Sequence, residues 1–319
     1  MNIKEKLDAF KNEVGKVMVG QEKVAELIFV SLLQRGHILF ESVPGTGKTM
    51  LSKTVAQAVG GTFKRIQFTP DILPSDITGL NIYNPKTQEF ELRIGPVDTN
   101  ILLADEINRA TPRTQSALLE VMGEKQVTID GERINIEEPF IVLATQNPIE
   151  SSQGNFDLPE AQLDRFLMKI DLGYPSREEE KMMLGLHGHT HPLDAVTPIF
   201  TKDEIVALQD ELSEVEVNDT IQDYILDLIH MTREHEHVEI GVSPRGTLAL
   251  VQAAKGVALV RGRDYVIPED IKYIAPFVIS HRLVLNIEGS TLTTPAIIAQ
   301  EVIATLEVPV EYGVVRNEV

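Results

Sequence analysis

Residues 41–49, with the sequence ESVPGTGKT, bring glycines, a lysine and a hydroxyl into one short stretch. An apolar run precedes it, and residues 50–59 follow with helical spacing. A Gly-rich turn between a strand and a helix is the context of a phosphate-binding loop, in which backbone N–H groups and the helix N-terminus surround phosphate oxygens. Lys48 would reach the β- and γ-phosphates, and the Thr49 hydroxyl would bind Mg²⁺. The residues expected to contact the nucleotide are Pro44, Gly45, Thr46, Gly47, Lys48, Thr49 and Met50.

One position departs from the general pattern G-x-x-x-x-G-K-[ST]. Ser42 stands where the first glycine is expected. A serine with a negative φ is tolerated there, whereas a positive φ would strain the loop. The backbone conformation at Ser42 therefore decides whether the substitution disturbs nucleotide binding.

Two carboxylates follow a second apolar run. Asp105 and Glu106 come directly after residues 101–104, which are Ile-Leu-Leu-Ala and indicate a central strand of a parallel sheet. Open α/β sheets bind ligands at the carboxyl ends of their strands. Two acids at a strand end can simply be solvated, but together with Lys48 they favour phosphoryl hydrolysis. Asp105 would then hold Mg²⁺, and Glu106 would polarise the attacking water.

Further polar residues could complete this site. Asn147 follows another apolar run, residues 140–144, and is suited to orient a water molecule, although a residue before a proline is also common in turns. Arg165 lies among apolar neighbours, and Arg245 lies in the first turn of a predicted helix, where a cation opposes the helix dipole. Either arginine could contact an anion or form an ordinary salt bridge. The loop Val19–Gly20 precedes the phosphate loop and could supply an adenine pocket.

The elements that must position these residues change in kind along the chain. Residues 1–172 contain strand patterns at 63–68, 101–104, 140–144 and 169–172, with helices between them. Residues 173–176, Gly-Tyr-Pro-Ser, indicate a linker, and almost only helices are predicted after it. We therefore expect an α/β nucleotide-binding domain with a parallel sheet at 1–172 and a smaller all-α domain at 173–319.

Two hairpins are predicted as insertions in the α/β domain. Residues 69–97 contain many prolines and glycines, too many for a buried crossover, and we expect a hairpin at 80–93. Residues 127–136 alternate on both sides of Asp130-Gly131, which is a strong hairpin signal.

Composition limits the partners. The 319 residues carry a formal net charge of −19, which argues against a surface that follows nucleic-acid phosphates and favours a protein partner. There is no cysteine, no run of apolar residues long enough to span a bilayer and no signal-peptide pattern in the first 20 residues. We therefore expect a cytoplasmic protein without membrane insertion.

The longest motifs resemble one family. The stretches ESVPGTGKT, FTPDILPSDITG, ADEINRATPRTQSALLEVM, ATQNP, LPEAQLDRF and SPRG, spread over nearly the whole chain, are similar to those of MoxR-family AAA+ ATPases. Short nucleotide-binding motifs are shared by many NTPases, whereas the long third and fifth stretches discriminate well. The resemblance implies an AAA+ domain followed by an all-α lid domain, with ATP and Mg²⁺ as cofactors.

The resemblance also implies roles and partners. Asn147 would be sensor 1, Arg165 an arginine finger acting on a neighbouring subunit's nucleotide, and Arg245 sensor 2. The chain would form a ring, most often a hexamer, that remodels a client protein, with von Willebrand factor A domain proteins as expected partners. In related machines the two hairpins face the ring pore or the substrate. The alternatives are a nucleic-acid motor and a nucleotide-gated scaffold with little turnover.

Overall fold

The computed structural model describes residues 2–42, 45–147, 155–186 and 192–309. The chain forms two compact units, Met1–Ser213 and Glu214–Val319, which are described separately below. Among the described helices, none combines the length and the apolar character that crossing a membrane requires.

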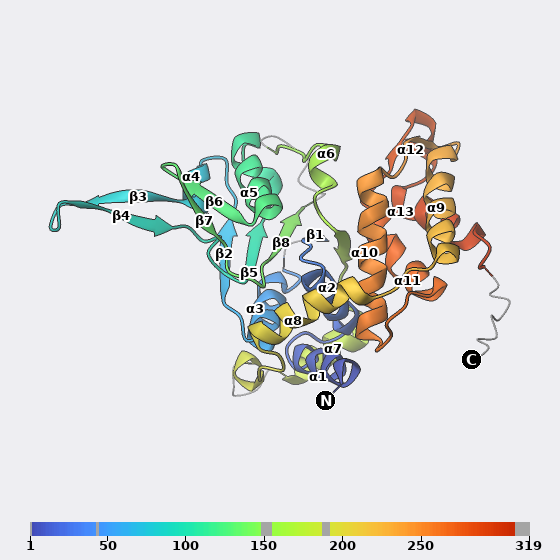
Figure 1. The fold of residues 1–319 in the computed structure, drawn as a ribbon, viewed down its shortest axis with the longest axis horizontal. Coiled ribbons are helices and arrows are strands. Elements are labelled where there is room, and N and C mark those ends of the chain that lie inside the picture. The colour runs from blue at the N-terminus through green and yellow to red at the C-terminus, as the bar shows by residue number, and fades with distance from the viewer. Residues whose placement is uncertain (1, 43–44, 148–154, 187–191, 310–319) are drawn as a thin grey trace, which may run out of the picture. The chain divides into compact units, whose positions relative to one another are not determined.

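A five-stranded parallel sheet forms the centre of the first unit (Figure 1). Its strand order is β2-β5-β8-β1-β9, so β8 lies between β1 and β5. The interior strands β5 and β8 are buried along nearly their whole length, which explains their continuous apolar runs. The strands are β1 (Ile38–Ser42), β2 (Phe63–Gln67), β5 (Ile101–Asp105), β8 (Ile141–Gln146) and β9 (Met168–Leu172). The parallel sheet expected from the sequence is confirmed.

Helices cover the sheet. One core joins sheet residues such as Leu102 and Val142 to α4, α5 and the second hairpin. Elsewhere α3 packs against β2 and β5, and α1 packs against α2 and α3. The helices are α1 (Ile3–Gly15), α2 (Glu22–Leu33), α3 (Lys48–Ala58), α4 (Pro74–Thr78), α5 (Pro112–Glu124), α6 (Glu160–Leu163), α7 (Arg177–Leu186) and α8 (Lys202–Glu211).

The first unit extends beyond residue 172, where we expected the domain boundary. Phe200 stacks on Phe29 with ring centroids 4.7 Å apart, and the Gln209 side chain donates a 2.8 Å hydrogen bond to the Leu32 carbonyl. The segment after β9 therefore returns to cover α2, and the boundary between the compact units falls at 213/214. Helical periodicity alone does not show which core a helix joins, and for this reason we placed the expected boundary too early in the chain.

Both predicted hairpins are present. The first pairs β3 (Gly79–Asn84) with β4 (Glu89–Ile94), and Figure 1 shows it extending away from the sheet. The second pairs β6 (Gln126–Ile129) with β7 (Glu132–Asn135). Its Asp130 accepts a 2.8 Å hydrogen bond from the Asn81 side chain, which links the two hairpins.

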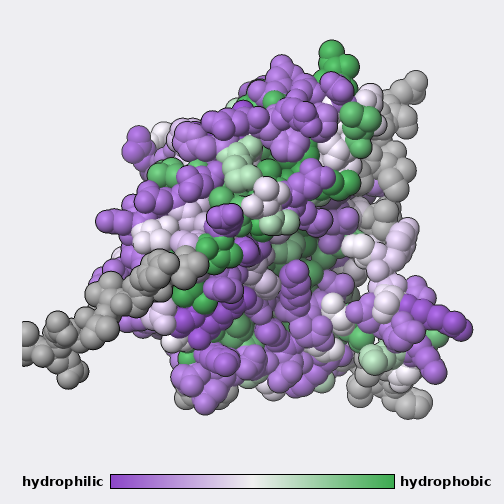
Figure 2. Space-filling model, turned by 90° about the vertical axis from the view of Figure 1, so that its right-hand side faces the viewer, coloured by the Kyte–Doolittle hydropathy of each residue, from purple (hydrophilic) through white to green (hydrophobic). Residues whose placement is uncertain are grey.

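The second unit is helical, as expected, with one short antiparallel strand pair that the sequence did not indicate. Asp270, fully buried at the start of α11, accepts hydrogen bonds from Arg261 and Arg263 at 2.6–2.8 Å. The elements are α9 (Asp219–Glu234), β10 (Val238–Ile240), α10 (Pro244–Val260), α11 (Pro268–Ile279), β11 (Val284–Leu285), α12 (Ile287–Leu292) and α13 (Pro295–Thr305). On the face shown in Figure 2, hydrophilic residues predominate.

Candidate functional site

The predicted chemical residues of the first unit lie at one edge of the sheet. Because β1, β5 and β8 are parallel and adjacent, their carboxyl ends meet at the same edge. The phosphate loop follows β1, Asp105 ends β5, and Asn147 directly follows β8. The register pairs Ala104 with Ala144, which places the ends of β5 and β8 side by side. The sheet thus brings together three motifs that are up to a hundred residues apart in the chain.

The phosphate loop has the backbone that its glycines predict. Gly45 and Gly47 have φ values of +88° and +82°, which residues with a Cβ rarely adopt. A Cβ at Gly45 would point into open space. Gly47 is the N-cap of α3, so Lys48, Thr49 and Met50 form the first turn of that helix. Pro44 lies outside the described residues.

Ser42 does not strain this loop. It is the last residue of β1 and pairs with Leu172 of β9. It is absent from the positive-φ positions among the described residues, so a serine is tolerated in its backbone conformation. Its buried hydroxyl finds no hydrogen-bond partner within the described structure. Ser42 therefore leaves the end of β1 undistorted.

Asp105 and Glu106 are held in place by neighbours that the sequence analysis did not single out. Asp105, 6% exposed, accepts a 2.7 Å hydrogen bond at Oδ1 from the Thr145 hydroxyl and a 2.6 Å bond at Oδ2 from Arg65. The Glu106 carboxylate accepts a 2.8 Å hydrogen bond from the Gln67 side chain and forms a 3.0 Å ion pair with Arg109.

Strand register explains these partners. Gln67 of β2 lies opposite Asp105 of β5, and Arg65, two residues earlier, shares its face of the sheet. The signal available in the sequence was the alternation of residues 63–68. Which strand they would pair with could only be known from the sheet order.

The Val19–Gly20 loop lies against the phosphate loop and α7. A Cβ at Gly47 would lie 2.9 Å from the end of the Met18 side chain, and a Cβ at Gly20, whose φ is +75°, would overlap the Glu179 carboxylate. The loop predicted to hold adenine is therefore close to the loop predicted to hold phosphates. Met18 and Glu179 are additional residues at this place.

Arg165 does not join the cluster at the sheet edge in the single chain. Helix α6 is short and ends before Arg165, and the residues that follow it form three-residue turns, with hydrogen bonds from Arg165 N to Gln162 O and from Phe166 N to Leu163 O. Phe166 is fully buried while Arg165 is exposed, and the Arg165 guanidinium donates a 3.2 Å hydrogen bond to the Leu119 carbonyl of α5. It borders a polar pocket of about 260 Å³, whose other lining residues are Ser116, Leu119, Glu120, Glu124 and Gln162.

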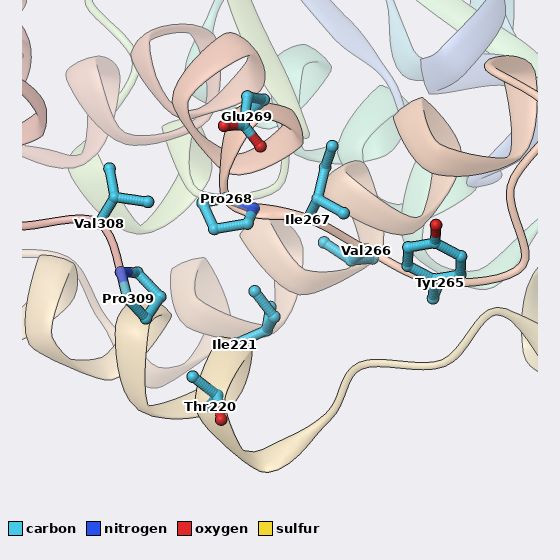
Figure 3. Close-up of a pocket in the computed structure, with 9 residues that line it drawn as sticks. All are labelled: Thr220, Ile221, Tyr265, Val266, Ile267, Pro268, Glu269, Val308 and Pro309. Atoms are coloured by element: carbon cyan, nitrogen blue, oxygen red, sulfur yellow. The ribbon is translucent and has the colours of Figure 1, made fainter. Parts of the chain in front are cut away.

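Arg245 belongs to the second unit. It is exposed in the first turn of α10, as predicted, where Ser243 caps the helix by accepting from the Gly246 N–H. A second cavity in this unit, about 250 Å³ in volume, lies where the start of α9 meets the segment before α11 (Figure 3). Its described lining is mainly apolar, and the charged side chain within that described part is Glu269, which would repel phosphate. None of the predicted site residues lines this cavity.

The chemistry of the residues at the sheet edge fits a nucleotide with Mg²⁺. The open space at Gly45 and the N–H groups at the start of α3 are suited to phosphate oxygens. The Thr49 hydroxyl and the Asp105 carboxylate are oxygen donors of the kind that Mg²⁺ prefers. When bound, Mg²⁺ supplies charge neutralisation at the β- and γ-phosphates.

Comparison with known proteins identifies the class of this fold and site. The sequence profile described as "ATPase family associated with various cellular activities (AAA)" matches residues 37–168, and the profile of the AAA lid domain matches residues 230–301. A solved structure of a protein from Cytophaga hutchinsonii assigned to the ATPases has a TM-score of 0.88 and 38% identity, covering 97% of this chain and 96% of that one.

Relatives define the family more narrowly. The protein "Chaperone MoxR1" of Mycobacterium tuberculosis is 45% identical over 93% of this chain and 81% of its own length. An uncharacterised protein of Bacillus subtilis, YeaC, is 50% identical over 95% of both chains, and "Protein MoxR" of Methylorubrum extorquens is 30% identical over 87% of both. The chain therefore belongs to the MoxR family of AAA+ ATPases.

Proposed function

We propose that this chain hydrolyses ATP with Mg²⁺ and uses the energy to remodel a client protein. The observation that carries the proposal is the convergence of the phosphate loop, the Asp105–Glu106 pair and Asn147 at one sheet edge. Lys48 would hold the β- and γ-phosphates, and Thr49 and Asp105 would hold Mg²⁺. Glu106 would polarise the attacking water, and Asn147 would orient it. Val19 and Gly20 would contact the adenine.

Hydrolysis would require assembly, because Arg165 serves a neighbouring subunit. Its side chain is exposed and points to α5, whereas the residues that follow it are buried in the core. An arginine in that position is available to another copy of the chain. Stabilisation of the γ-phosphate charge by an arginine in trans increases hydrolysis by about 10³–10⁵-fold in other NTPases. We further propose that the copies form a ring, a hexamer, and that Arg245 senses the nucleotide from the helical lid.

The first experiment measures the ATPase rate per subunit against protein concentration, for the wild type, Glu106→Gln and Arg165→Ala. The wild-type rate should rise with concentration, and both variants should lose activity. Lys4→Ala, which removes an exposed cation of α1, is the control and should keep the wild-type rate.

Mixing the two inactive variants tests the trans arrangement directly. A mixed ring contains interfaces with an intact Glu106 on one subunit and an intact Arg165 on its neighbour, so partial activity should return. A rate that is independent of concentration and survives Arg165→Ala would disprove the trans role. Tight ATP binding without turnover would favour the nucleotide-gated scaffold, and turnover that requires DNA would favour the nucleic-acid motor.

The client would contact the first hairpin. Tyr83 and Phe90 form an edge-to-face pair near its tip and are 51% and 71% exposed, and Leu92 lies on the same face. A large apolar face on a protruding two-stranded sheet indicates a binding surface. The resemblance to chaperone-like relatives makes a von Willebrand factor A domain protein the proposed client.

The client proposal is tested by the ability of such a domain to change the ATPase rate. The double variant Tyr83→Ser/Phe90→Ser should keep the basal rate but lose both client binding and the rate change. Leu226→Ser, which removes an exposed apolar residue of α9, is the control. Equal responses of the wild type and the hairpin variant would remove the hairpin from the client interface.

A further inference from the structure

One hydroxyl contacts both acidic positions of the site. Thr145, fully buried in β8, donates from Oγ1 to Asp105 Oδ1 at 2.7 Å and accepts the backbone N–H of Glu106 at 2.8 Å. A hydroxyl has one donor and two acceptor positions, so both bonds can form at once. The Thr145 side chain of β8 thus contacts both the last residue of the neighbouring strand β5, Asp105, and the residue that follows it, Glu106.

The backbone of Glu106 shows why this contact is needed. Glu106 has φ +59° and ψ +50°, the left-handed conformation, which is unfavourable for a residue with a Cβ. Such conformations persist where surrounding contacts hold them, and they cluster at functional sites. Here the hydrogen bond from the Glu106 N–H to the Thr145 hydroxyl holds Glu106 in this turn.

The two oxygens of Asp105 have partners of different kinds. Oδ1 is bound by the buried hydroxyl of Thr145, whereas Oδ2 is bound by Arg65, whose side chain is 44% exposed. The Arg65 side chain can turn toward solvent, whereas Thr145 is fully buried. Oδ2 is therefore the oxygen that becomes free for a metal ion or its water, and Thr145 keeps it oriented by holding Oδ1.

We propose that Thr145 is a positioning residue, which orients the Asp105 carboxylate toward Mg²⁺ and holds Glu106 in its left-handed turn. This inference rests on the proposed ATPase function. A valine at this position keeps the shape of threonine but leaves the Glu106 N–H without an acceptor and Asp105 Oδ1 without a donor. Loss of groups that orient a metal ligand typically reduces metal affinity or activity by about 10–100-fold.

The test compares Thr145→Val with Thr145→Ser, which restores the hydroxyl. Two quantities are measured: the Mg²⁺ concentration at half-maximal ATPase rate, and the Mg²⁺ concentration at half-maximal binding of a fluorescent ATP analogue, which needs no turnover. Thr145→Val should raise both half-maximal Mg²⁺ concentrations by about 10-fold or more and should lower kcat. Thr145→Ser should return all three values to those of the wild type. The control is Thr114→Val, because Thr114 is also buried and its hydroxyl binds the Ile72 carbonyl in another part of the same unit.

The possible outcomes distinguish failure of the proposed role of Thr145 from failure of the proposed ATPase function. If Thr145→Val lowers the melting temperature but leaves both Mg²⁺ dependences and kcat at wild-type values, Thr145 is only structural and the inference is overturned. Failure of Thr145→Ser to restore the values would also overturn it, because the hydroxyl would not be the cause. A wild type that binds nucleotide with Mg²⁺ but does not turn over would refute the ATPase function, and the binding measurement would still decide the role of Thr145. A wild type without Mg²⁺-dependent binding would refute both.

Discussion

A buried histidine should make the stability of the first unit depend on pH. His37 precedes β1 and is 4% exposed. Its Nδ1 accepts the Val142 N–H at 3.0 Å, so Nε2 carries the proton and donates it to the Met122 carbonyl at 3.1 Å. Burial lowers the pKa of His37 from 6.5 to about 4; the hydrogen bond to the Met122 carbonyl opposes this decrease, and the Lys125 charge adds to it. The neutral ring is therefore the form that the folded unit accommodates.

The pKa difference gives the sign and the size of the effect. Above pH 6.5 the ring is neutral in the folded and the unfolded chain, and the full stability is present. Below that pH the unfolded chain takes up a proton that the folded chain refuses, so stability is lost until the pH passes the folded pKa of about 4. At about 1.4 kcal/mol per pH unit, the loss from this residue is about 2 kcal/mol at pH 5 and on the order of 3 kcal/mol in total.

Urea unfolding of the wild type and His37→Gln, followed by circular dichroism at about pH 7.5 and about pH 5, isolates this contribution from all other titrating groups. The variant should be less stable at the higher pH, and its deficit should shrink by about 2 kcal/mol at the lower pH. His230→Gln, at an exposed position of α9, controls for the loss of a histidine as such. A deficit that stays constant between the two pH values would refute the reasoning.

Two further predictions concern carboxylates with arginine partners. Asp270→Asn should destabilise the second unit by about 2–3 kcal/mol, because it removes the buried anion that two partly exposed guanidinium groups hydrogen-bond, and thermal unfolding compared with the exposed-site control Asp223→Asn measures this. An unchanged unfolding temperature would contradict it. Arg65→Ala should lower the Mg²⁺ concentration needed for half-maximal nucleotide binding by up to about fivefold, because a half-exposed ion pair that competes for Asp105 contributes up to about 1 kcal/mol. A higher Mg²⁺ requirement would mean that Arg65 assists the metal.

Most of the α/β architecture could be predicted, because its signals are local. Continuous apolar runs predicted the buried strands β5 and β8, and alternation around Asp130-Gly131 predicted the second hairpin. The phosphate loop was equally clear, since its glycines have the positive φ values that only glycine adopts easily. At these positions the local conformational preference of the sequence and the tertiary structure favour the same residue types.

The contacts around the acids could not be predicted, because they depend on strand order and register. Nothing in the alternation of residues 63–68 says that β2 pairs with β5, yet that pairing brings Arg65 and Gln67 to Asp105 and Glu106. The predicted domain boundary at residue 172 differs from the boundary between the compact units for the same reason, because its position depends on tertiary contacts. The helices after residue 172 were predicted correctly, but only the tertiary contacts of Phe200 and Gln209 show that they complete the first unit.

The contacts of the acids also constrain how the site can work. Asp105 is bound by Arg65, and Glu106 is bound by Gln67 and Arg109, so both carboxylates have partners within the protein. Those partners all have exposed or half-exposed positions, whereas Thr145 is fully buried. On the proposed function, nucleotide and Mg²⁺ would displace the exposed partners Arg65, Gln67 and Arg109, while the buried Thr145 hydroxyl would hold both acids in place.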